Sequence, residues 1–235
     1  TVVFDKTGTL TLAQPHVGAI HRFGESSEEE LLRLAATAEH KQTHPIAKAI
    51  LTAAQERGLE LTSIQEARYE MGYGLKIITT EGQTVLVGSQ RFLEMQGLTM
   101  SSEIQTLQSY CNEQGNSLIY ISIANPTESL ALAGAIELHA TIRPEAKQVV
   151  ADLKQRGLSI YIISGDHSRP TQKLAEELGI PNYFADTLPK DKAKLIEQLQ
   201  QAGKKVAFVG DGINDAIALK TANVSISLRG ASTIA

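Results

Sequence analysis

Three short apolar runs end in polar residues of the kinds used in phosphoryl transfer. Asp5, Ser164 and Asp211 each follow a run with the composition of a buried strand, and Lys192 lies early in a helix expected to begin at Pro189. Mg²⁺ prefers carboxylate oxygens, and a lysine neutralises the oxygens of a transferred phosphoryl group. A carboxylate that attacks phosphorus forms an acyl phosphate. These residues predict Mg²⁺-assisted phosphoryl transfer, with Asp5 as nucleophile or metal ligand.

The elements expected around these residues bring them together. Strand and helix patterns alternate from about residue 137 to residue 228, which predicts an α/β fold with a parallel sheet and helices on both faces. The strand that ends at Asp5 belongs chemically with this half. Ligands of open parallel sheets bind at the carboxyl ends of the strands, and Asp5, Ser164 and Asp211 are all expected there.

Residues 13–134 follow a different pattern and are expected to form an inserted α+β domain, with residues 1–12 and 135–235 forming the α/β domain. Ser26 and Ser27 stand at capping-box spacing before Glu29 and Glu30, so a helix is predicted there. The other expected helices are 45–57, 101–115, 144–156, 170–178, 189–202 and 214–220. The expected strands are 2–5, 75–79, 84–87, 117–124, 130–136, 158–163, 205–209 and 224–228.

Composition excludes several classes of protein. The 235 residues are 42% hydrophobic and 20% charged, as in a folded globular chain. The net charge of −4 argues against a nucleic-acid partner. No apolar run approaches the ~20 residues of a membrane span, and no signal peptide is visible. The chain opens directly on a strand pattern without an initiator Met, so we interpret it as a piece of a longer protein.

The motifs at the strand ends resemble those of P-type ATPases, the ion-pumping branch of the haloacid-dehalogenase superfamily. The phosphorylation signature of that family is similar to Asp5-Lys6-Thr7-Gly8-Thr9-Leu10-Thr11. Its three further motifs resemble Ser164-Gly165-Asp166, Pro189-Lys190-Asp191-Lys192 and Gly210-Asp211-Gly212-Ile213-Asn214-Asp215. The resemblance covers the whole chain. It implies a Rossmann-like phosphorylation domain that carries an inserted nucleotide-binding domain.

The resemblance also implies a role for each motif residue. Asp5 would attack the γ-phosphate of ATP, with Lys192 and Thr7 as further catalytic residues. Asp5, Asp211 and the Thr7 carbonyl would hold Mg²⁺. The phosphoryl oxygens would be held by Lys6, Thr7, Ser164, Gly165, Lys192 and Asn214. Related soluble phosphatases place an Asp two residues after the nucleophile as general acid and base. Thr7 cannot act in that way at neutral pH, so the aspartyl phosphate is expected to hydrolyse slowly.

The inserted domain resembles that of the heavy-metal (P1B) subfamily. Thr43-His44-Pro45, with Glu39 upstream, is similar to the Ser-Glu-His-Pro region of that subfamily, and Gly72-Tyr73-Gly74 resembles its Gly-x-Gly loop. The resemblance implies that Glu39 and His44 contact adenine. Gly72 and Gly74 would let the backbone approach the nucleotide with unusual φ angles.

Several positions depart from the family pattern. They are Thr43, Ser89, Ala140, His167, Ile217 and the segment 223–229, which includes Ser225 and Arg229. The nucleophile, magnesium and lysine positions are retained. We therefore expect the departures to affect nucleotide affinity and domain closure more than the chemistry.

The function implied is that of the ATP-binding and phosphorylation domains of a heavy-metal-translocating P-type ATPase. The expected cofactor is Mg²⁺, with ATP as substrate. The expected partners are the transmembrane and actuator domains of the same polypeptide and a heavy-metal ion, with copper the commonest in the subfamily. The chain would lie on the cytoplasmic side of a membrane. Two alternatives stay open, a soluble phosphatase with a substrate-selecting cap and a regulatory module that binds nucleotide without catalysis.

The remaining cysteine and histidines are expected to be structural. Cys111, the single cysteine, lies on a predicted helix and is interpreted as a core thiol rather than a metal ligand. His16, His21, His40 and His139 show no metal-ligand spacing along the sequence.

Overall fold

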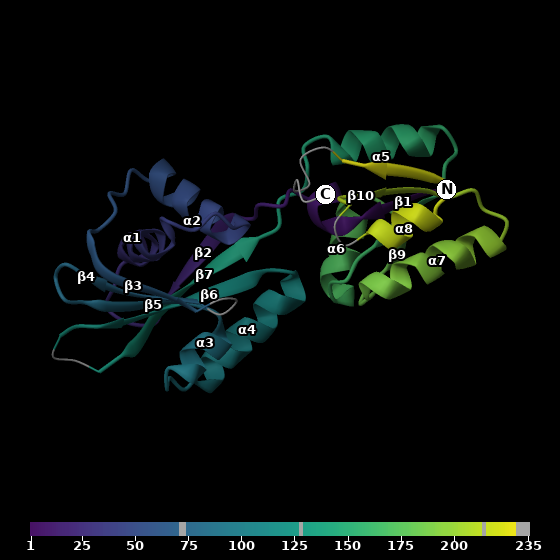
Figure 1. Ribbon diagram of the computed structural model, residues 1–235. Helices are drawn as coiled ribbons and strands as arrows, with labels where there is room; N and C mark the ends of the chain where they lie inside the picture. The colour runs from purple at the N-terminus through teal and green to yellow at the C-terminus, as the bar shows by residue number, and fades with distance from the viewer. Residues whose placement is uncertain (71–73, 127–128, 213–214, 229–235) are drawn as a thin grey trace. The chain divides into compact units, whose positions relative to one another are not determined.

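The computed structural model describes residues 1–70, 74–126, 129–212 and 215–228 (Figure 1). The chain divides into two compact units. The parallel-sheet unit holds residues 1–13, 113–115 and those from 140 onward, and the antiparallel-sheet unit holds residues 14–112 and 116–139. None of the helices in these ranges is long and apolar enough to span a bilayer.

The parallel-sheet unit contains five strands in the order β11-β10-β1-β8-β9, and every neighbouring pair is parallel. The strands are β1 (Val2–Asp5), β8 (Ile160–Ile163), β9 (Asn182–Phe184), β10 (Ala207–Gly210) and β11 (Val224–Ser227). The helices are α5 (Ala146–Gln155), α6 (Ser168–Glu177), α7 (Pro189–Gln201) and α8 (Ala216–Thr221). The predicted α/β class with a parallel sheet is confirmed.

Alternating side chains of β1 divide the core of this unit into two layers. Val2 and Phe4 pack in a cluster with Val150 of α5 and Leu174 of α6. Val3 packs on the opposite face with α7 and α8, whose Ile196 and Ala218 belong to the second cluster. Because successive side chains of β1 point to opposite faces and helices cover both faces, β1 is buried on each side. Its carboxyl end lies at the centre of one sheet edge.

The antiparallel-sheet unit contains six strands in the order β2-β7-β6-β5-β4-β3. The strands are β2 (His16–Arg22), β3 (Ile64–Glu70), β4 (Gly74–Thr79), β5 (Thr84–Gly88), β6 (Ser117–Ala124) and β7 (Ala131–His139). One face packs against α1 (Glu28–Glu39) and α2 (Pro45–Glu56), and the other against α3 (Gln90–Met95) and α4 (Ser102–Gln114) (Figure 1).

Local signals account for several helix ends. The Ser27 hydroxyl caps α1 by accepting the Glu30 N–H, as the capping-box spacing predicts. Pro45 opens α2, where a missing N–H costs nothing. Pro144, expected inside a helix, precedes α5, which begins at Ala146.

The sequence patterns missed four elements. β2 and β3 are the two edge strands of their sheet, and their mixed polar composition hides the alternation that a buried strand shows. The third is β9, which has three residues, and the fourth is α3, which has six, so each is too short to display a period. β7 also continues to His139, beyond the expected strand end at 136.

Candidate active site

The carboxyl ends of three adjacent strands bring the predicted catalytic residues to one sheet edge. Asp5 ends β1, the central strand, and pairs in register with Ile163 at the end of β8. Ser164 follows β8 directly and is buried. Asp211 follows β10, which pairs with β1 on its other side. Parallel pairing therefore places residues more than 150 positions apart at the same edge.

Lys192, in the first turn of α7, joins two buried carboxylates at this edge. Its Nζ donates to Oδ1 of Asp5 at 2.5 Å and to Oδ1 of Asp215 at 2.6 Å. All three residues are at most 5% exposed. Charge-assisted hydrogen bonds of this length in a site shielded from water fix the position of the Asp5 carboxylate. The sequence did not identify Asp215 as the second partner of Lys192, although it lies in the Gly-rich motif.

The pKa values of both Asp5 and Lys192 are raised, but for different reasons. Burial is the main effect on Asp5 and raises its pKa to about 6, against the attraction of Lys192 and with the repulsion of Asp215 and Asp211. Burial by itself lowers the pKa of Lys192, but the two carboxylates outweigh it and the pKa lies above the ordinary lysine value. Lys192 is therefore a cation at neutral pH.

Negative charge exceeds positive charge around Asp5, which suits a hard divalent cation. The charge of Lys192 on Asp5 is opposed by those of Asp215 and Asp211, and Oδ2 of Asp215 is buried without a hydrogen-bond partner among the described residues. A Cβ on Gly8, whose φ is +75°, would lie 3.3 Å from Oδ2 of Asp211. Glycine at position 8 therefore leaves space beside the Asp211 carboxylate, and a larger residue at that position would fill it. This oxygen-rich donor set fits Mg²⁺.

The loop Lys6–Leu10 that follows Asp5 is held by Arg143. Nε of Arg143 donates to the Thr9 carbonyl at 2.8 Å, and Nη2 donates to the Gly8 carbonyl at 2.9 Å. The Thr11 N–H closes the loop onto the Lys6 carbonyl at 3.1 Å. A planar guanidinium matches two neighbouring carbonyls in a way that lysine cannot. Sequence reasoning missed Arg143, and its only signal was its place before Pro144.

The other residues predicted to bind phosphate lie near the same edge in different settings. The ammonium of Lys6 forms an ion pair with Asp166, so the charge expected for phosphate is engaged by a carboxylate. Oγ of Ser164 accepts the Asp166 N–H at 3.1 Å. Thr7 and Gly165 are exposed. Asn214 lies outside the described residues.

In the antiparallel-sheet unit, His44 and Glu39 lie side by side between α1 and α2. Nδ1 of His44 caps α2 by accepting the Ala47 N–H at 3.2 Å, and Nε2 lies 3.2 Å from Oε2 of Glu39. That oxygen is buried, and no described group forms a hydrogen bond with it. Burial raises the pKa of Glu39 to about 7 and lowers that of His44. A buried polar atom without a partner is costly unless a ligand satisfies it.

Two further positions in this unit have structural roles of their own. Gly74 opens β4 in an extended conformation, so the expected unusual φ is absent there. A Cβ on Gly74 would lie 2.3 Å from Cδ1 of Phe92, so the glycine is needed for packing against α3. Ser89 caps α3 by accepting the Phe92 N–H. Gly72 lies outside the described residues.

The chain is similar in sequence to curated P-type ATPases. The copper-exporting P-type ATPase of Vibrio cholerae serotype O1 is 37% identical over 235 residues, all of this chain and 25% of the relative. The copper-exporting P-type ATPase B of Archaeoglobus fulgidus is 36% identical over 234 residues, and 32% of its length is matched. The chain thus spans about a quarter to a third of these curated relatives.

The chain is also similar in fold to solved structures. A zinc-transporting PIB-type ATPase in the E2.Pi state superposes with a TM-score of 0.78 at 34% identity, over 97% of this chain and 35% of that one. The catalytic CPx-ATPase domain CopB-B gives a TM-score of 0.68 at 29% identity, over 100% of this chain and 79% of that one. Residues 1–223 match the family described as haloacid dehalogenase-like hydrolase. The chain therefore belongs to the haloacid dehalogenase-like hydrolases.

Proposed function

We propose that this chain is the ATP-binding and phosphorylation part of a heavy-metal-translocating P-type ATPase. The observation that carries the proposal is the buried Asp5 carboxylate at the end of the central strand, held by Lys192 at 2.5 Å. The parallel-sheet unit would be the phosphorylation domain and the antiparallel-sheet unit the nucleotide-binding domain. The family and the copper- and zinc-transporting relatives support this assignment.

The proposed reaction is transfer of the γ-phosphoryl group of ATP to Asp5. Lys192 holds Oδ1, which leaves Oδ2 as the attacking oxygen. The bond from Oδ2 to phosphorus forms as the bond from phosphorus to the β–γ bridging oxygen breaks, and ADP leaves with that electron pair. Lys192 stays within reach of the developing charge. Asp5, Asp211 and the Thr7 carbonyl would hold Mg²⁺, which would neutralise charge on the phosphate oxygens.

Thr7 sets the fate of the phosphorylated residue in this proposal. Its side chain is exposed two positions after Asp5, and a hydroxyl cannot act as a general base for water at neutral pH. Hydrolysis is therefore slow compared with transfer. A persistent acyl phosphate suits a pump that must change conformation before dephosphorylation.

Glu39 and His44 are proposed to bind the adenine of ATP, with Gly72 and Gly74 lining the approach. Oε2 of Glu39 lies 3.2 Å from Nε2 of His44 but forms no hydrogen bond with a described group, so it could accept one from an exocyclic amino group. The His44 ring offers a neutral face for stacking because burial lowers its pKa.

The longer protein is proposed to move a heavy-metal cation across a membrane, with this part on the cytoplasmic side. Its transmembrane and actuator domains would be partners of this chain within one polypeptide. Copper is the first candidate for the cargo because the sequence relatives are copper exporters.

The proposal is tested by incubating the chain with Mg²⁺ and γ-labelled ATP and quenching in acid. Wild-type protein is expected to carry a hydroxylamine-sensitive label that Asp5→Asn abolishes. Asp191→Asn is the matched control, because Asp191 is a carboxylate on α7 that pairs with Lys194 rather than Lys192. Label that persists in Asp5→Asn would contradict the assignment of Asp5 as the nucleophile. Rapid turnover of small phosphomonoesters without preference for ATP would contradict the assignment of the chain to an ATPase.

A further inference from the structure

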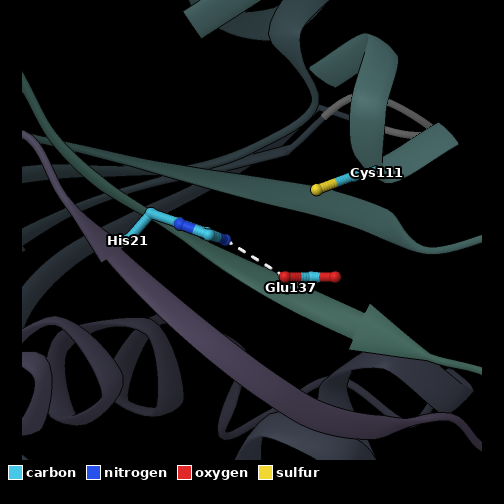
Figure 2. Close-up of side chains that lie close together, drawn as sticks. All are labelled: His21, Cys111 and Glu137. Carbon is cyan, nitrogen blue, oxygen red and sulfur yellow. Dashed lines mark hydrogen bonds and ion pairs between the residues drawn. The ribbon is translucent and has the colours of Figure 1, made fainter. Parts of the chain in front are cut away.

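A histidine, a cysteine and a glutamate from three separate elements converge in the antiparallel-sheet unit. His21 lies on β2, Glu137 on β7 and Cys111 on α4, and Figure 2 shows the three side chains gathered between the helix and the sheet. One donor atom from each lies within 4.8 Å of the others. Sequence spacing gave no sign of this group because 90 residues separate His21 from Cys111.

Sheet register explains why these side chains share a face. His21 pairs directly with Ala135, which packs in the same cluster as Cys111 beneath α4. Glu137 lies two residues beyond Ala135 on β7 and so projects to that face. Ile136, between them, packs in the opposite cluster against α1 and α2. The fold therefore holds the His21 and Glu137 backbones in position before any ligand binds.

The Glu137 carboxylate is already oriented by its neighbours. Oε2 lies 3.1 Å from Nε2 of His21. Oε1 accepts from Nδ2 of Asn116 at 2.6 Å and lies 2.9 Å from Nε2 of His139. Outer partners of this kind hold the ligands of protein metal sites in place. The His21 side chain is 27% exposed while Glu137 is 10% exposed, which leaves one side of the group open to solvent.

We propose that His21, Cys111 and Glu137 form a Zn²⁺ site in this unit, separate from the phosphorylation site. Thiolate, imidazole and carboxylate are together the ligand types of zinc. Mg²⁺ takes oxygen ligands and would not recruit the sulfur or the imidazole, while Cu⁺ prefers sulfur and imidazole without carboxylate. Water occupies the fourth position, on the open side.

The required movement is small. Tetrahedral Zn²⁺ with bonds of ~2.0–2.3 Å keeps its ligand atoms about 3.3–3.8 Å apart, so donors at the 4.8 Å limit would close in by roughly 1 Å. The His21 and Glu137 donors, 3.1 Å apart, already lie near that spacing. On binding, Sγ of Cys111 loses its proton to solvent and bonds to the metal. Nε2 of His21 and Oε2 of Glu137 exchange their mutual contact for metal bonds. Zinc would thereby link β2, β7 and α4.

The test is a titration of the chain with Zn²⁺ against a chromophoric chelator, in excess Mg²⁺ to occupy oxygen-only sites. One Zn²⁺ per chain is expected. Cys111→Ser and His21→Gln should each weaken binding by about tenfold or more. His40→Ala is the control because His40 is exposed and outside the group. Co²⁺ in place of Zn²⁺ should give a thiolate charge-transfer band that Cys111→Ser removes.

Three results would contradict the proposed Zn²⁺ site. They are no saturable Zn²⁺ binding by wild-type protein, unchanged affinity in both variants, and binding of Cu⁺ without Zn²⁺. His21→Gln keeps the test decisive even if Cys111→Ser fails to fold, because the His21 side chain is partly exposed. A circular dichroism spectrum matching that of wild type shows that each variant is folded.

Discussion

The ammonium of Lys192 lies 2.5 Å from Oδ1 of Asp5, although 187 positions separate the two residues in the chain. The same ammonium reaches Asp215, so one cation is shared by two buried carboxylates. Removing it would leave both anions buried without compensation, which is far more costly than losing an exposed pair. The Lys192 ammonium therefore sets the charge balance around Asp5 and contributes to the stability of this sheet edge.

Lys192→Met is expected to lower the rate of phosphoenzyme formation by about 10²–10³-fold, because the charge on the transferred group loses its fixed cation. It should also raise the pKa of Asp5 above its present value of about 6. Rapid-quench labelling with ATP measures the rate. Lys190→Met is the matched control, since Lys190 is exposed on the same helix. Equal rates for the two variants would show that Lys192 has no part in transfer.

Arg143→Lys is expected to slow phosphoenzyme formation by about 10²-fold, because a displacement of about 1 Å in the loop after Asp5 misaligns the nucleophile. Lysine keeps the charge but cannot bond the Gly8 and Thr9 carbonyls together. Nucleotide affinity should stay unchanged. The same labelling assay measures the effect, with Arg156→Ala, exposed at the end of α5, as control. A wild-type rate in Arg143→Lys would refute a positioning role.

Binding of a non-hydrolysable ATP analogue separates the two roles of His44. His44→Asn keeps a side chain that can cap α2 but removes the imidazole. It is expected to weaken calorimetric binding several-fold while thermal stability changes little. His44→Ala should weaken binding and also cost about 1 kcal/mol of stability through the lost cap. Wild-type affinity in His44→Asn would exclude the ring as a nucleotide contact.

Glu39 makes the antiparallel-sheet unit less stable as pH rises. Burial raises its pKa from 4.5 to about 7, so the folded state holds a proton that the unfolded state releases. The unfolding free energy should therefore fall between pH 4.5 and pH 7, by about 3 kcal/mol in total. The unfolding free energy of Glu39→Gln should not show this fall between pH 4.5 and pH 7. Hydrogen exchange of α1 amides at pH 5 and pH 7.5, corrected for intrinsic rates, measures it. An equal pH dependence in both proteins would contradict the assignment.

The parallel-sheet half could be predicted in most respects from sequence. Continuous apolar runs such as Val2–Phe4 mark strands buried on both faces, and Pro189 marks a helix start, because both signals act over a few residues. Since parallel strand ends share an edge, the meeting of Asp5, Ser164 and Asp211 followed from the order of elements. The edge strand β3 of the other sheet did not follow, because its mixed polar composition hides the alternation of a buried strand.

The sequence by itself determined the element order and the chemical types at the strand ends. Tertiary structure decided which charges pair, joining Lys192 to Asp215 as well as Asp5 and engaging Lys6 with Asp166. It also brought Cys111 to Glu137, which no spacing in the chain announces. The physical reason is the distance along the chain over which each kind of interaction acts. Periodicity and caps are set by neighbours a few residues away, whereas a side-chain contact depends on register and helix placement that only the packed core fixes.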